Sequence, residues 1–125
     1  MCGDSGAMEV FLDFAVEAAH LLPKVPAGHP CGSLHGHTWK ITVIVAGPID
    51  EEMGWVVDYG VVIAAFEPLR LELDHHYLND IAGLENPTTE NLARWIWRRL
   101  APVLPGLCRL QIRETGNSGC IYAGE

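Results

Sequence analysis

Three stretches of this chain place hydrophobic side chains at every second position, which is the period of a β-strand with one buried face. They cover residues 10–20, 35–47 and 107–115, and a short run at residues 120–122 predicts a last strand. Residues 21–34 separate the first two stretches and are rich in proline and glycine, so they predict a loop. We therefore expect two long strands that pair antiparallel across this loop.

Two further stretches repeat hydrophobic side chains at the spacing of an α-helix. Asp58 and Thr88 stand where the N-caps of these helices are expected. The first buried stripe is predicted to contain Val62, Phe66, Leu69 and Leu73. The second is predicted to contain Ala93, Ile96, Trp97 and Leu100. Pro68 predicts a kink in the first helix. The order strand, strand, helix, helix, strand, strand predicts an α+β domain, with both helices on one side of a four-stranded antiparallel sheet.

Composition narrows the class of protein. The chain has 125 residues and a net charge of −8, which argues against nucleic acid as the main partner. It contains no long apolar run that predicts a membrane span, and residues 1–10 lack the basic start and apolar centre of a secretion signal. We expect a cytoplasmic protein with a flexible tail over residues 1–9 and one catalytic domain over residues 10–125.

The four cysteines are Cys2, Cys31, Cys108 and Cys120. An even number is compatible with two disulfides, but the missing secretion signal favours reduced thiols. We expect Cys108 and Cys120 to be small packed hydrophobic residues and Cys2 to belong to the tail. Cys31 is the candidate for chemistry, because it lies four residues before a pair of histidines.

Three histidines are expected to meet at one end of the predicted hairpin. His35 and His37 are two residues apart at the start of the second strand, so both imidazoles point to the same face. His20 ends the first strand on its apolar face and lies beside them if the strands pair antiparallel. Three imidazoles without a fourth protein ligand are typical of a catalytic zinc site. The alternative is three stacked core histidines, and we take His29 to be a loop residue.

Two more positions carry candidate chemistry. Asp74 precedes His75, and a carboxylate beside an imidazole can fix its tautomer and raise its basicity. The alternative for this pair is a cationic side chain at a helix C-terminus. Glu114 interrupts the apolar face of its strand and could bind donors of a ligand, or else form a salt bridge with a neighbouring arginine. Three arginines of the second helix are interpreted as a solvated face rather than a phosphate site: Arg94, Arg98 and Arg99.

Several motifs together resemble the family of 6-pyruvoyl- and 6-carboxytetrahydropterin synthases. They are Phe14-x-x-Glu17-Ala-Ala-His20, Cys31-x-x-x-His35-Gly-His37, Leu73-Asp74-His75, Asn86-Pro-Thr-Thr-Glu90 and Glu114-Thr115. The resemblance extends over nearly the whole chain. It implies the tunnelling fold, with sheets joined into a barrel and trimers stacked into a homohexamer whose active sites lie between subunits.

The resemblance also implies roles for individual residues. The zinc ligands would be His20, His35 and His37. Catalysis would rest on the thiol of Cys31 and on the Asp74–His75 relay. The pterin would be anchored by Glu114 and lined by Thr88 and Thr89.

Within this family, the short spacing between Cys31 and His35 is similar to the bacterial branch of queuosine synthesis. That branch implies a 6-carboxy-5,6,7,8-tetrahydropterin synthase, which converts 7,8-dihydroneopterin triphosphate to the 6-carboxy product, acetaldehyde and triphosphate. Residues 116–118 depart from the expected pattern. The alternatives are a 6-pyruvoyl-tetrahydropterin synthase and a zinc- and pterin-binding protein without turnover.

Overall fold

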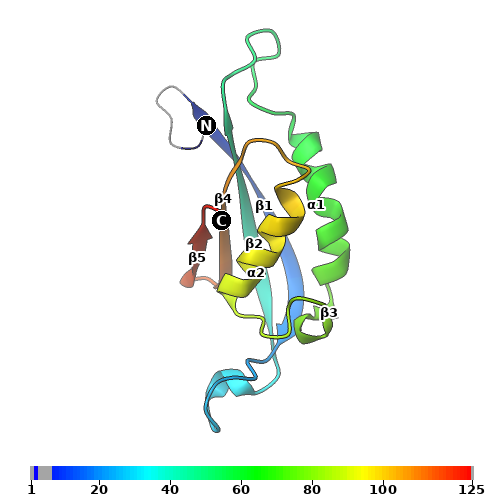
Figure 1. The fold of residues 1–125 in the computed structure, drawn as a ribbon, viewed down its shortest axis with the longest axis vertical. Helices are drawn as coiled ribbons and strands as arrows, with labels where there is room; N and C mark the ends of the chain where they lie inside the picture. The colour runs from blue at the N-terminus through cyan, green and yellow to red at the C-terminus, as the bar shows by residue number, and fades with distance from the viewer. Residues whose placement is uncertain (1, 3–6, 125) are drawn as a thin grey trace.

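The computed structural model describes residue 2 and residues 7–124, which form one mixed sheet of five strands covered by two α-helices (Figure 1). The strands are β1 (Met8–His20), β2 (His35–Gly47), β3 (His76–Tyr77), β4 (Leu107–Thr115) and β5 (Ser118–Tyr122). The helices are α1 (Tyr59–Leu73) and α2 (Thr89–Leu100). The order in the sheet is β3-β1-β2-β4-β5. No helix in these residues has the length and apolar character needed to cross a membrane.

The long hairpin of β1 and β2 forms the centre of the sheet. The two strands pair antiparallel along their whole length, from Met8 opposite Gly47 to His20 opposite His35. β1 begins two residues earlier than the alternation predicts. The residues between the strands form the predicted loop, which contains a single short 3₁₀ turn at Pro30–Gly32. This register brings the end of β1 beside the start of β2.

The predicted four-stranded antiparallel sheet is wrong in one respect, because β3 adds a fifth strand that runs parallel to β1. Ala18 lies opposite His76 in this pair. A strand of two residues is too short to show alternation, so the pattern of the sequence does not reveal it.

Both helices lie on the same face of the sheet, as predicted (Figure 1). The Asp58 carboxylate caps α1 by accepting from Gly60 N–H, and the Thr88 hydroxyl caps α2 by accepting from Asn91 N–H. The buried residues of α1 are the four of the predicted stripe, and Pro68 lies inside this helix. In α2, Leu92 is also buried, whereas Trp97 is only partly buried and packs against Tyr122.

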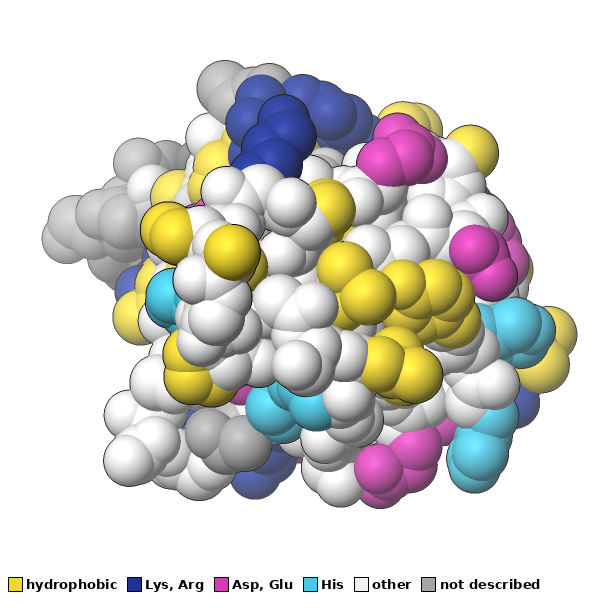
Figure 2. All heavy atoms as spheres, turned by 90° about the horizontal axis from the view of Figure 1, so that it is seen from below, with side chains coloured by type: hydrophobic (Ala, Val, Ile, Leu, Met, Phe, Trp, Pro, Cys, Tyr) yellow, Lys and Arg dark blue, Asp and Glu magenta, His cyan; other side chains and the backbone are white. Residues whose placement is uncertain are grey.

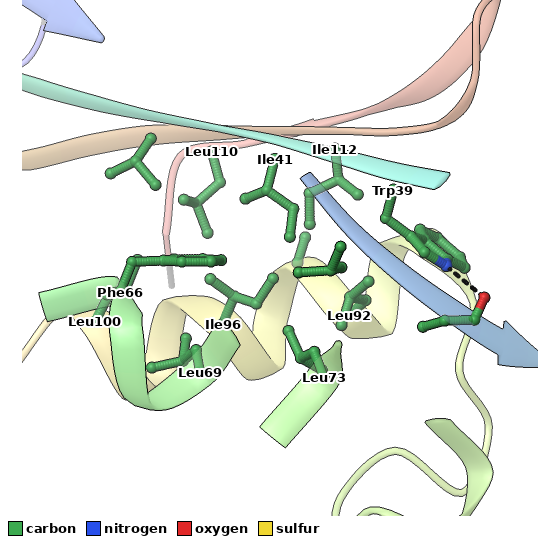
Figure 3. Packing of buried hydrophobic residues seen from close by; sticks show 14 of the residues in the cluster. Trp39, Ile41, Phe66, Leu69, Leu73, Leu92, Ile96, Leu100, Leu110 and Ile112 are labelled. Carbon is green, nitrogen blue, oxygen red and sulfur yellow. Dashed lines mark hydrogen bonds between the residues drawn. The ribbon is translucent and has the colours of Figure 1, made fainter. Parts of the chain in front are cut away.

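The core fills the space between the helices and the inner face of the sheet (Figure 3). Trp39 and Ile41 of β2 and Phe66 of α1 are almost completely buried. The Trp39 indole N–H donates to the carbonyl of Ala18 at 3.2 Å, so the polar edge of this ring is satisfied next to the histidine end of the hairpin.

The opposite face of the sheet has no helix over it. Its polar residues pair across the strands: the Thr38 hydroxyl donates to the Glu17 carboxylate, and Thr42 donates to Asp13. Phe11 is 63% exposed, although it lies on a central strand. An open sheet face that exposes apolar side chains is compatible with an interface between subunits.

The cysteine prediction is wrong for two residues. Cys2 forms a disulfide with Cys108 of β4, with Cα atoms 5.2 Å apart. The starts of β1 and β4 lie at the same end of the sheet, on either side of β2, and this brings the N-terminal cysteine to Cys108. Cys31 and Cys120 are free. Of the predicted flexible tail, Met8 and Glu9 belong to β1, and residues 1 and 3–6 lie outside the described part of the chain.

Candidate metal centre and active site

The pairing of β1 and β2 brings the three predicted histidines together on the helix-covered face. His20 lies opposite His35, and His37 lies opposite Ala18 one step further along the sheet. The ring centroids are 4.5 Å apart for His20–His35, 5.2 Å for His20–His37 and 4.7 Å for His35–His37. One ring nitrogen of each lies within 4.8 Å of the others. This spacing allows all three imidazoles to bind one ion.

Backbone carbonyls orient two of these rings. His20 Nδ1 lies 2.8 Å from the carbonyl oxygen of Pro87, and His35 Nδ1 lies 2.6 Å from that of Ser33. Because a carbonyl can only accept, each Nδ1 carries the proton when the ring is neutral. The lone pair is then on Nε2, which is the form that a histidine needs as a metal ligand.

Two buried ring nitrogens distinguish between a metal site and the alternative of stacked core histidines. The Nε2 atoms of His20 and His37 are buried, and neither forms a hydrogen bond within the described residues. A buried polar atom without a partner is unfavourable by about 1–3 kcal/mol, so a packed histidine core would leave this penalty uncompensated at His20 Nε2, whereas His37 Nε2 has a Glu114 carboxylate oxygen 3.7 Å away. A metal ion bound to these atoms removes it. The donor set therefore fits a metal, and imidazole ligands suit zinc.

The electrostatics of His20 favour the ligand form. Its side chain is only 1% exposed. Loss of solvation is the main reason that its pKa is lowered, and the nearby His35 and His37 rings lower it further, against opposing effects of the Pro87 hydrogen bond and the Glu114 carboxylate. His20 is therefore neutral at neutral pH, with its lone pair free for an ion.

Glu114 extends the site along β4. One carboxylate oxygen accepts from the Thr89 hydroxyl at 2.7 Å, and the other lies 3.7 Å from His37 Nε2. The salt bridge with a neighbouring arginine does not occur within the described residues; Arg113 instead donates to the Gly116 carbonyl. Glu114 is 30% exposed in its side chain, so it can still accept from a ligand. Thr88 caps α2 beside it.

The Asp74–His75 pair lies at the outer edge of β1, where α1 ends. One oxygen of Asp74 accepts from Glu17 N–H at 2.8 Å, and the other lies 3.1 Å from His75 Nδ1. The Glu17 hydrogen bond is the main reason that the pKa of Asp74 lies below its ordinary value, with smaller contributions from His75 and Arg70. The carboxylate is thus placed to orient the imidazole, as predicted.

His75 has an unusual backbone and an exposed side chain. Its φ of 60° is in the left-handed region, and its N–H donates to the Glu17 carbonyl. The side chain is 78% exposed. It borders a hollow of about 520 Å³ together with Gly36, His37 and Thr38. Within the described residues its ring has one polar partner, Asp74, and no interaction joins it to Cys31 or His20.

Cys31 lies in the 3₁₀ turn of the loop and is partly exposed. Its N–H donates to His29 Nδ1 at 3.0 Å, and its carbonyl accepts from Leu22 N–H at 2.8 Å. His29 is a loop residue, as predicted, and its side chain caps the turn that carries the thiol. The thiol itself has no hydrogen-bond partner among the described residues.

Two positioning residues escaped the analysis of the sequence. Pro87 supplies the carbonyl that orients His20. Asn79 binds both backbone groups of Leu21, accepting from its N–H at 3.1 Å and donating to its carbonyl at 2.9 Å. This clamp holds the residue that follows His20. Both act through contacts more than fifty residues away in the chain, which no local pattern reveals.

The fold with three converging imidazoles at the end of its sheet defines the class as the tunnelling-fold proteins. The structure of Caenorhabditis elegans 6-pyruvoyl tetrahydropterin synthase shares this fold, with a TM-score of 0.87 over 95% of this chain and 96% of that chain, at 23% identity. The model of the family described as 6-pyruvoyl tetrahydropterin synthase matches residues 9–125. The chain belongs to this family of pterin-synthesising enzymes.

Two relatives are similar in sequence. The 6-carboxy-5,6,7,8-tetrahydropterin synthase of Synechocystis is 40% identical over 119 residues, which cover 90% of this chain and 91% of the relative. The dihydroneopterin monophosphate aldolase of Pyrococcus furiosus is 42% identical over 89 residues, which cover 69% of this chain and 75% of the relative.

Proposed function

We propose that this protein is a zinc-dependent 6-carboxy-5,6,7,8-tetrahydropterin synthase of queuosine biosynthesis, acting on 7,8-dihydroneopterin triphosphate. The observation that carries the proposal is the group of three imidazoles, of which His20 is buried and the other two are partly buried, with the Glu114 carboxylate 3.7 Å from His37. The Synechocystis relative, similar over nearly the whole chain, supports the choice of product.

The ion would be held by the histidine group, His20, His35 and His37. When bound, zinc supplies a Lewis acid that polarises the hydroxyl groups of the substrate side chain. Glu114 would accept from the amino group and ring N–H of the pterin, because its carboxylate is half-buried and held by Thr89. Thr88 and Thr89 would line the pterin at the start of α2.

Cys31 and His75 would move the protons. Cys31 as thiolate would remove a proton from the substrate side chain, and His75, oriented by Asp74, would donate or accept its counterpart. Triphosphate leaves by elimination. Retro-aldol cleavage of the carbon–carbon bond then releases acetaldehyde and, with one water consumed, leaves the 6-carboxy product.

The proposed mechanism requires a second subunit near His75. The exposed His75 ring and the uncovered sheet face both favour a homo-oligomer in which the relay of one chain completes the site of its neighbour. A hexamer made of two trimers, with the sheets joined into barrels, is the assembly that we propose.

The test is incubation of the zinc-loaded protein with 7,8-dihydroneopterin triphosphate, followed by mass spectrometry. A 6-carboxy pterin with an equal amount of acetaldehyde supports the proposal. A 6-pyruvoyl pterin with its side chain intact would show a 6-pyruvoyl-tetrahydropterin synthase instead. Turnover of dihydroneopterin monophosphate in preference to the triphosphate would show the activity named for the Pyrococcus relative. Zinc and pterin binding without turnover would show a binding protein.

A further inference from the structure

A cationic cavity lies between the loop that follows β1 and the exposed side of α2. Its volume is about 400 Å³. Three of its lining residues are basic, Lys24 from the loop and Arg94 and Arg98 from α2. Amide side chains of Asn86 and Asn91 and the ring of Trp95 complete much of the wall. In the view of Figure 2, Lys and Arg side chains gather in one group at the upper margin.

This concentration of positive charge is unusual for the chain. The protein has eight Lys and Arg residues against sixteen Asp and Glu. Outside the cavity, four of the basic side chains are paired with carboxylates, namely Lys40, Arg70, Arg99 and Arg109. Lys24 and Arg94 have no such partner within the described residues. The carboxylate at the cavity, Glu85, accepts from Gly83 N–H at 2.8 Å.

The cavity includes a residue next to the one that orients His20. Asn86 lines the cavity, and the carbonyl of the next residue, Pro87, accepts from His20. The Asn91 amide donates to the Asn86 carbonyl at 2.9 Å, which fixes this wall to α2. The segment that orients His20 therefore also forms part of the basic cavity.

We propose that this cavity binds the phosphate groups of the pterin substrate. The inference rests on the proposed function, since it assigns the phosphate subsite of that reaction. Guanidinium groups bind phosphate oxygens through paired N–H donors, and an ammonium group adds a point charge. The local positive charge also offsets the repulsion that a polyanion meets at a protein with a net charge of −8.

The test combines a binding measurement with kinetics. The binding of inorganic triphosphate to the purified protein is measured by calorimetry at fixed ionic strength, with the metal content assayed before and after. Lys24→Gln and Arg94→Gln are each expected to weaken binding about two- to fivefold, the range for an exposed charged contact. Both residues are exposed, so both variants should fold. The same variants should raise the KM for 7,8-dihydroneopterin triphosphate and leave the KM for unphosphorylated dihydroneopterin unchanged.

A control variant removes a positive charge elsewhere. Arg109→Gln acts at the far end of the sheet, where Arg109 pairs with Glu9. It should bind triphosphate like the unmodified protein.

Equal weakening in cavity and control variants would overturn the subsite, since it would reflect net charge alone. Weaker triphosphate binding with an unchanged KM would contradict the assignment to substrate and show a site for a free anion. Absence of turnover in the unmodified protein would refute the proposed function, and the calorimetry would still decide whether the cavity binds triphosphate.

Discussion

The histidine group and the Asp74–His75 pair differ in how completely one chain builds them. The histidine group is assembled inside the chain, with His20 almost completely buried and its Nδ1 held by a carbonyl. His75 is 78% exposed and its backbone is in the left-handed region. Asp74 is its one polar partner within the described residues.

This difference indicates two kinds of preorganisation. The candidate metal ligands are held by the burial of His20 and by backbone carbonyls at His20 and His35, because a rigid environment keeps the ring lone pairs directed at one point. The relay is held at its backbone and its carboxylate, while its imidazole extends into solvent. A left-handed backbone at a residue other than glycine is unfavourable by about 1–3 kcal/mol and is usually retained for function. Its exposed imidazole is therefore accessible to a group outside its own chain.

The largest expected effect is that of removing one histidine from the histidine group. His35→Ala should reduce bound zinc from about one ion per chain to near zero and lower turnover by about 10³-fold or more, because Lewis-acid polarisation contributes several kcal/mol. His76→Ala is the matched control, since the His76 ring binds the Asp74 carbonyl outside the group. Metal analysis and steady-state kinetics measure both. Unchanged zinc in His35→Ala would refute the ligand assignment.

The next largest effects are those of replacing Cys31 and His75. These variants also test whether the two residues of one site come from different chains. Cys31→Ala and His75→Asn should each retain zinc and lose about 10²–10⁴-fold in turnover, the usual contribution of an acid or base. Asparagine tolerates the left-handed region, so the second variant should keep the fold.

Co-expression of these two variants should restore activity in about a quarter of the sites, the random chance that an intact Cys31 meets an intact His75 in a closed ring. Co-expression of Cys31→Ala with Cys31→Ser should restore none. Failure of the first mixture, with mixed oligomers present, would contradict a shared site.

The smallest expected effect is on stability, because the Asp74 carboxylate should make the free energy of unfolding depend on pH. The pKa of Asp74 is lowered in the folded protein, so its ionised form stabilises the fold at pH values above the unfolded pKa of about 4. This contribution is lost as the pH falls through the lowered, folded pKa. Urea unfolding between pH 3 and 7 should show a difference in the free energy of unfolding between the unmodified protein and Asp74→Asn, and this difference should narrow below about pH 4. A difference that is constant with pH would contradict a role for the charge.

Much of the site could be predicted because its signals are local. The spacing of His35 and His37 on one strand places two ligands on one face, and His20 ends the facing strand. Asp74 beside His75 is a contact between neighbours. The contacts of Cys31 in the proline- and glycine-rich loop could not be predicted in this way. Its hydrogen bond to His29 depends on a turn that has no periodic pattern in the sequence.

By itself, the sequence determined the two long strands, both helices with their caps, and the three histidines of the candidate metal centre. These follow from side-chain period and from spacing, which are properties of neighbouring residues. Tertiary structure alone decided the parallel strand at His76, the disulfide from Cys2 to Cys108, and the cavity that joins Lys24 to Arg94. Each of these depends on where chain segments far apart in sequence pack against one another, and alternation and composition carry no information about that.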